Sequence, residues 1–125
     1  KQLITALNPL SVGVIKHSHH KNIQIQDKGK DTERFRNAGA VFSICFPALK
    51  PFPEALSSVG SCDVLLVEGY RNSPIPKLLY APQEHLDPHW TIPKQINAQV
   101  GNHQPHIKVI DDNLGAIKDW VLSFL

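Results

Sequence analysis

The amino-acid sequence predicts an α/β domain whose mainly parallel sheet is flanked by helices. Two observations lead to this prediction. Short apolar runs alternate with stretches of helical periodicity, which is typical of strands connected by helices. The run VLLV at 64–67 is continuously apolar, as in strands that are covered on both faces. At 125 residues the chain has the length of one ordinary domain, so we predict a single domain over residues 1–125.

The first three elements are read from periodicity and from capping residues. Residues 1–8 (KQLITALN) carry apolar side chains at helical spacing, which predicts the end of a helix. Residues 11–16 (SVGVIK) predict a strand. Residues 31–39 (DTERFRNAG) predict a short helix that begins at Asp31 or Thr32 as its N-cap and stops before its closing glycine.

The middle of the chain repeats this alternation. Residues 40–46 (AVFSICF) predict a second strand, and 53–60 (PEALSSVG) a short helix. Residues 62–69 (CDVLLVEG) predict a third strand, whose apolar core ends at an acid. We expect Cys45 and Cys62, which lie in or beside these strands, to be reduced core thiols.

The last third of the chain has a different composition. Residues 72–93 hold five of the ten prolines and predict extended chain or loop, with KLLY at 77–80 as an edge strand at most. Residues 106–111 (HIKVID) predict another strand. From Asp112 or Asn113 onward the apolar residues form one stripe, which predicts a helix that covers the sheet.

Composition excludes some classes of function. The formal net charge of +2 is too small to indicate nucleic-acid binding. No apolar run approaches the roughly 20 residues that cross a bilayer, and the N-terminal residues do not resemble a secretory signal. We therefore expect a cytoplasmic protein without membrane or nucleic-acid partners.

The basic residues are nevertheless unevenly distributed. Six of the thirteen fall in one short segment: Lys16, Lys21, Lys28, Lys30, Arg34 and Arg36. Such a cluster favours an anionic ligand, although a solvated surface without a ligand has the same pattern.

Glu68 and Gly69 follow the third predicted strand. In parallel sheets ligands bind outside the carboxyl ends of the strands, and a carboxylate there can hold Mg²⁺ while a glycine admits close approach of the backbone. Apolar strands that end in glutamate are also common without any metal. Lys30 and Asp31 begin the predicted helix, where backbone N–H groups favour anions, although Asp31 could be only an N-cap.

Three histidines end the first predicted strand. His17, His19 and His20 have a spacing that suits a transition metal, hydrogen bonding to a phosphate, or a loop with no role. The other histidines, His85, His89, His103 and His106, are scattered among prolines and asparagines and are predicted to lie at the surface. The sequence contains none of the GxSxG, HExxH and GxxxxGK[ST] patterns.

Taken in order, VGVIKHSHH, KGKDTERFRNAGA and CDVLLVEGYRNSPIPKL resemble the molybdopterin-guanine dinucleotide biosynthesis protein B (MobB) family. The resemblance covers residues 12–79 and loosens from Tyr80 onward. It implies a P-loop NTPase-like protein that binds GTP with Mg²⁺, hydrolyses it weakly, and assists the attachment of GMP to molybdopterin. The partners it implies are GTP, molybdopterin or a guanylyltransferase protein, and a second copy in a homodimer.

The resemblance also implies roles for individual residues. Glu68 and Asp31 would be the catalytic acids and the metal ligands. The remaining residues of the implied site would bind the nucleotide, with the first four on the same face: Lys16, His17, His19, His20, Lys30 and Gly69.

One part of the family pattern is absent. In the family a phosphate-binding loop and its strand precede the helix that we read at residues 1–8. We therefore expect this first strand and P-loop to be missing from the chain, which also contains no methionine. If the chain is the whole molecule, we expect no measurable GTPase activity; if it is part of a longer protein, the family function applies to the parent. The alternatives are a non-enzymatic module that binds a pterin phosphate or a partner, and a histidine-dependent metal-binding domain.

Overall fold

The structure is a computed structural model that describes residues 2–18, 31–83, 86 and 95–125, with the backbone alone at residues 31 and 32. It divides the chain into two compact units, Lys1–Tyr70 and Arg71–Leu125, which are described separately. The expectation of a single domain stays a prediction.

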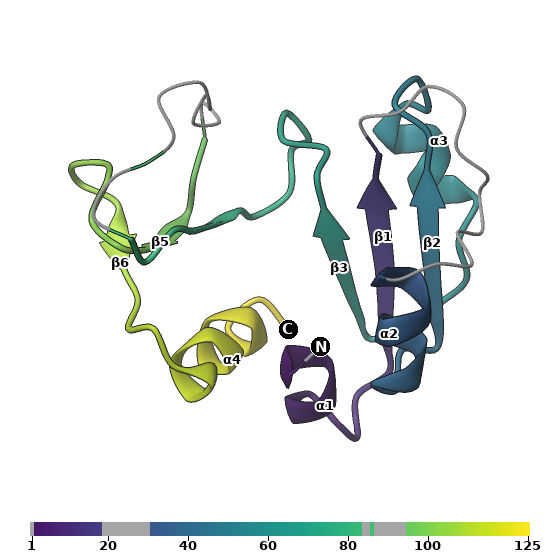
Figure 1. The fold of residues 1–125 in the computed structure, drawn as a ribbon, viewed down its shortest axis with the longest axis horizontal. Coiled ribbons are helices and arrows are strands. Elements are labelled where there is room, and N and C mark those ends of the chain that lie inside the picture. Colours follow the sequence, from purple (N-terminus) through teal and green to yellow (C-terminus); the bar gives the residue numbers. More distant parts are fainter. Residues whose placement is uncertain (1, 19–30, 84–85, 87–94) are drawn as a thin grey trace. The chain divides into compact units, whose positions relative to one another are not determined.

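The first unit is built on a parallel sheet of three strands (Figure 1). The strands are β1 (Val12–His17), β2 (Phe42–Phe46) and β3 (Val64–Glu68), in the order β2-β1-β3. β1 is therefore the central strand and pairs in parallel with both neighbours. The three strands coincide with the three predicted ones, and their carboxyl ends lie at the same edge.

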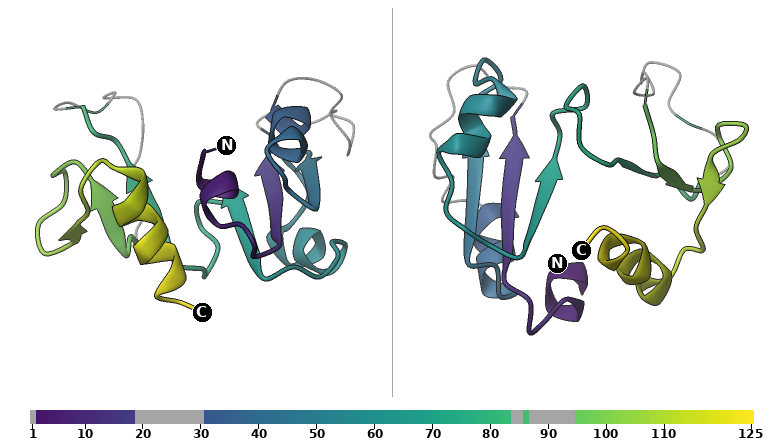
Figure 2. Two further views of the ribbon diagram at one scale, coloured as in Figure 1. Left: turned by 90° about the horizontal axis from the view of Figure 1, so that it is seen from below. Right: turned by 180° about the vertical axis from the view of Figure 1, so that it is seen from behind.

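Three helices accompany this sheet: α1 (Gln2–Ala6), α2 (Asp31–Asn37) and α3 (Phe52–Ser57). The connections β1–β2 and β2–β3 run in opposite directions across the sheet, and right-handed crossovers in opposite directions place their helices on opposite faces. Figure 2 shows α2 and α3 on opposite sides of the strands. The predicted helices at both connections are confirmed.

One buried cluster of the first unit lies between the sheet and α3. Its buried members are Ile15 in β1, Phe46 at the end of β2, Ala55 in α3 and Tyr70 after β3. Residues two apart on a strand point to the same face, so His17 shares the face of Ile15, whereas Lys16 lies on the opposite face. Each large apolar side chain buried here stabilises the fold by about 1.5–3 kcal/mol.

The second unit contains three short parallel strands and one helix. The strands are β4 (Leu78–Tyr80), β5 (Ala98–Val100) and β6 (Lys108–Val109), in that order, followed by α4 (Leu114–Leu122). Side chains of α4 pack on a small core formed by Ala98, Val100 and Ile110. The α4 helix begins as predicted: the Asn113 side chain caps it by accepting a hydrogen bond from the Ala116 N–H at 2.7 Å.

The structure confirms the predicted fold class, because both units have parallel strands accompanied by helices. Both cysteines are free thiols, with Cys45 buried and Cys62 half-buried. Across the described ranges, no helix combines the length and the apolar character that crossing a membrane requires.

Candidate functional site

The candidate site lies at the carboxyl edge of the β2-β1-β3 sheet. Here Lys16 of β1 and Glu68 of β3 are Cα partners in the parallel register. Neighbouring strands are about 4.8 Å apart, and paired residues point to the same face, so the two side chains leave neighbouring strands on one face of the sheet. Glu68 is exposed and Lys16 is half-buried. The edge therefore presents the Glu68 carboxylate to solvent, as the sequence predicted, on the face from which Lys16 also projects.

His17, the next residue of β1, points to the other face of the sheet. Its ring stacks on Tyr70, with ring centroids 3.8 Å apart and planes inclined by 5°. Its Nε2 lies 2.9 Å from the carbonyl oxygen of Ala48. Because a carbonyl oxygen only accepts, this bond requires the proton on Nε2 and leaves Nδ1 as the nitrogen with no assigned role. The expectation that Lys16 and His17 line the same face is wrong, because alternation along the strand separates them.

Gly69 and Tyr70 form the turn that follows Glu68. Both have a positive φ, 93° at Gly69 and 48° at Tyr70. A Cβ atom at Gly69 would lie 2.8 Å from the Cβ of His17, so a glycine is required where β3 passes the end of β1. The glycine therefore serves the packing of the two strand ends, whereas its predicted role was close approach to a ligand.

Tyr70 is anchored at both ends of its side chain. The ring is buried against His17 and Phe52, and the hydroxyl donates a hydrogen bond to the Lys50 carbonyl oxygen at 2.8 Å. Burial, with a smaller contribution from Cys45, raises the pKa of the Tyr70 hydroxyl above its ordinary value of 10.0. The hydroxyl therefore remains a donor throughout the neutral pH range.

Of the remaining predicted site residues, the structure describes only the backbone of Asp31. Asp31 is the first residue of α2, which runs antiparallel to the strands on the face of Lys16 and Glu68. A helix of 7 residues is about 10 Å long, and Figure 1 shows α2 beside the lower half of the strands. The helix start is thus not level with Glu68. His19, His20 and Lys30 lie outside the described residues.

The His, Cys, Asp and Glu side chains near the site determine which metal ion it could hold. The described part of the chain contains no group of three or more His, Cys, Asp and Glu side chains that could hold a metal ion. Mg²⁺ does not need such a group, because it is usually held by one or two carboxylates together with waters and substrate phosphates. Glu68 fits this pattern, and His17, whose Nε2 is hydrogen bonded to Ala48, gives no support to a histidine-based transition-metal site.

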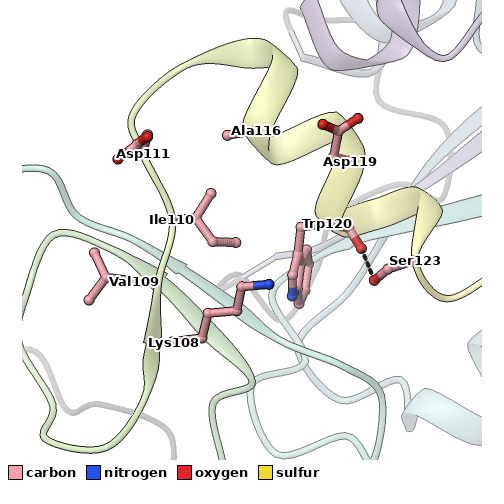
Figure 3. A pocket seen from close by; sticks show the side chains of 8 residues that line it. All are labelled: Lys108, Val109, Ile110, Asp111, Ala116, Asp119, Trp120 and Ser123. Carbon is pink, nitrogen blue, oxygen red and sulfur yellow. Dashed lines mark hydrogen bonds between the residues drawn. The ribbon is translucent and has the colours of Figure 1, made fainter.

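A pocket of about 310 Å³ lies in the second unit, between β6 and α4 (Figure 3). Its walls include the Trp120 ring, toward which the Lys108 side chain extends, and the exposed carboxylates of Asp111 and Asp119. It contains none of the predicted site residues. Ile110 and Trp120 belong to the packing contact between α4 and its sheet. We therefore interpret this pocket as the solvent-exposed edge of that contact.

Sequence reasoning missed the structural role of Tyr70 and of the turn Pro47–Lys50. Two carbonyl oxygens of this turn, those of Ala48 and Lys50, accept the hydrogen bonds from His17 and Tyr70. The only signal in the sequence is an aromatic residue directly after the glycine of VEGY. Nothing in the sequence connects that residue with His17.

Comparison with known proteins agrees with the resemblance in the motifs. The sequence profile of the family described as molybdopterin guanine dinucleotide synthesis protein B matches residues 1–101. A molybdopterin-guanine dinucleotide biosynthesis adapter protein from Haemophilus influenzae is 32% identical over an alignment that covers 93% of this chain and 74% of that protein. No solved structure matches the chain. The chain therefore belongs to the molybdopterin guanine dinucleotide synthesis protein B family.

Proposed function

We propose that this protein is a GTP-binding accessory protein of molybdenum cofactor biosynthesis, which assists the attachment of GMP to molybdopterin. Family membership and the relative named as an adapter protein support a role in molybdopterin-guanine dinucleotide biosynthesis. Binding of GTP with Mg²⁺ is the finer part of the proposal. We place this activity in the cytoplasm.

One observation carries the finer part: an exposed carboxylate, Glu68, ends a strand of a parallel sheet beside Lys16 of the neighbouring strand. A nucleotide with its cation brings negative phosphates and a positive metal together. The Lys16 ammonium group can neutralise a phosphate oxygen, and the Glu68 carboxylate can bind the cation directly or through water. The carboxyl edge of a parallel sheet is the usual place for such a ligand.

The residues of the proposed site have separate tasks. Glu68 holds the cation, and Asp31, at a helix start that is not level with Glu68, acts on the same cation through a bridging water. Lys16 and Lys30 bind phosphate oxygens, together with His19 and His20 from the segment after β1, and Gly69 sets the turn that follows Glu68. His17 is given no contact with the nucleotide in this proposal, because its ring lies on the other face of the sheet, stacked on Tyr70 and hydrogen bonded to Ala48. When bound, Mg²⁺ would neutralise charge on the phosphates of the nucleotide.

Any hydrolysis of GTP is proposed to be weak, as the resemblance to the family implies. The sequence contains no GxxxxGK[ST] loop, whose backbone N–H groups and lysine surround the phosphates in P-loop proteins. We propose that the protein acts with a second copy of itself and with the guanylyltransferase that transfers the GMP group.

A second candidate function follows from the same edge. The basic residues at the end of β1 and the segment after it could bind a pterin phosphate or a protein partner without any nucleotide. Binding of that kind needs the positive charge of Lys16 but no cation at Glu68. The two functions therefore differ in their dependence on a divalent metal.

A thermal-shift titration with GTP separates the two functions. The melting temperature is measured with GTP and Mg²⁺, with GTP and a chelator, and with Mg²⁺ alone. The proposed function predicts a rise that requires both GTP and Mg²⁺, because a ligand that binds only the folded state stabilises it. A rise that survives chelation would support the phosphate-binding module, and the absence of any rise would refute GTP binding by this chain.

A further inference from the structure

Tyr70 adopts a backbone conformation that residues with side chains rarely adopt. Its φ of 48° follows the φ of 93° at Gly69, so two successive residues are in the left-handed region. In a bulky residue this conformation costs free energy and persists only where the surrounding contacts determine it. The strained residue lies two positions after Glu68, whose carboxylate belongs to the candidate site.

The contacts of Tyr70 explain how the conformation is held. Tyr70 is 8% exposed; its ring stacks on His17 with 3.8 Å between centroids and packs against Phe52 with 5.2 Å between centroids. The hydroxyl donates to the Lys50 carbonyl oxygen at 2.8 Å.

The stacked pair also connects three parts of the sheet edge. His17 ends β1, Tyr70 follows β3, and both rings hydrogen bond to carbonyl oxygens of the turn Pro47–Lys50, which follows β2. The carboxyl ends of all three strands are thereby held by one pair of rings. A shift of either ring would therefore also move the backbone at Glu68.

We propose that Tyr70 is a positioning residue for Glu68. Stacked on His17, it fixes the left-handed turn at Gly69 and Tyr70, and so fixes the direction in which Glu68 presents its carboxylate to a divalent cation bound with a nucleotide. This inference rests on the proposed function of the same edge. In this role Tyr70 does not contact the ligand.

Three variants separate a positioning role of Tyr70 from a purely structural role. Tyr70→Phe keeps the stacked ring and loses the hydroxyl. Tyr70→Ala loses the ring and keeps the left-handed strain, whereas Tyr70→Gly loses the ring and relieves the strain. Tyr70→Gly should therefore recover part of the melting temperature that Tyr70→Ala loses. If Tyr70 positions Glu68, this variant should not recover metal affinity.

The test measures the affinity of the full chain for Mn²⁺ in the presence of GTP, by electron paramagnetic resonance, with melting temperatures recorded on the same samples. Loss of a residue that orients a metal ligand typically weakens metal affinity about 10- to 100-fold, and we expect this for Tyr70→Ala and Tyr70→Gly. Tyr70→Phe should bind Mn²⁺ as the unmodified protein does. Glu68→Gln is the reference for loss of the ligand itself.

The outcomes distinguish the two proposals. Wild-type affinity in Tyr70→Gly, with affinity lost in Glu68→Gln, would overturn the positioning role and leave the metal role intact. Unchanged affinity in Glu68→Gln would overturn the metal role and the positioning role with it. If the Tyr70 variants do not fold, His17→Phe and His17→Ala replace them. The positioning role then predicts that Mn²⁺ affinity is kept with a stacking ring and lost without one, and equal affinities would overturn it.

Discussion

Gly69→Ala tests the close packing of the two strand ends that form the candidate site. The new Cβ would lie 2.8 Å from the Cβ of His17 and 3.3 Å from its carbonyl oxygen, well inside ordinary carbon contact distances. The left-handed backbone at this position adds a cost of about 1–2 kcal/mol for any residue with a Cβ. Displacing His17 adds the cost of overpacking, about 1–3 kcal/mol. The free energy of unfolding should therefore fall by roughly 2–5 kcal/mol.

Two other glycines serve as matched controls for Gly69→Ala. Gly39 has a φ of 111° and no atom within 4 Å of the position that a Cβ would take, so Gly39→Ala should show the conformational cost alone. Gly60 has open space and no positive φ, so Gly60→Ala should stay within about 0.5 kcal/mol of the wild type. The assay is urea unfolding followed by far-UV circular dichroism. If Gly69→Ala destabilises no more than Gly39→Ala, the close approach of Gly69 to His17 is refuted.

Three further predictions concern stability. Gln99→Leu removes a fully buried amide that makes four hydrogen bonds to the loop after β5. It should lower the free energy of unfolding by roughly 3 kcal/mol, measured by urea unfolding followed by tryptophan fluorescence. Gln95→Leu, at an exposed position, should lower it little. Asn113→Ala should lower the stability of the second unit by about 1 kcal/mol through loss of the α4 cap, and Asn113→Asp, which keeps an acceptor, should not. The raised pKa of Tyr70 means that folding disfavours its ionisation, so the stability it contributes is present below about pH 10 and is lost as pH rises through the folded pKa. Denaturant titrations at increasing alkaline pH should show a shallower loss in Tyr70→Phe, and an identical slope would contradict this assignment.

Most of the first unit could be predicted from the sequence because its signals are local. The continuous apolar run before Glu68 indicates a buried parallel strand, and the structure has β3 there. The N-cap residues and the closing glycine predicted α2, which ends at Asn37. The exposed carboxylate of Glu68 at the edge of the sheet also follows from the strand pattern alone.

What the sequence did not predict depends on contacts between distant residues. β5 was missed because it has only three residues, and its central residue, Gln99, is a polar side chain that is nevertheless fully buried. The prediction that His103 lies at the surface was wrong, because its ring is half-buried and its Nε2 lies 2.6 Å from the Ala81 carbonyl oxygen. The stack of His17 on Tyr70 joins residues on two strands, and no periodicity in the sequence reports such a pair.

The measurement that tests the central claim most directly is equilibrium dialysis of labelled GTP against the full chain, with and without Mg²⁺. Wild type, Glu68→Gln and Asp63→Asn are compared. Asp63 precedes the same strand at its other end and accepts a hydrogen bond from the Ser11 N–H, which asparagine can still accept, so this control removes an equal charge away from the site. We predict Mg²⁺-dependent binding of GTP that Glu68→Gln abolishes and Asp63→Asn retains. Binding that is independent of Mg²⁺, or equal in the two variants, would contradict the role of the Glu68 edge.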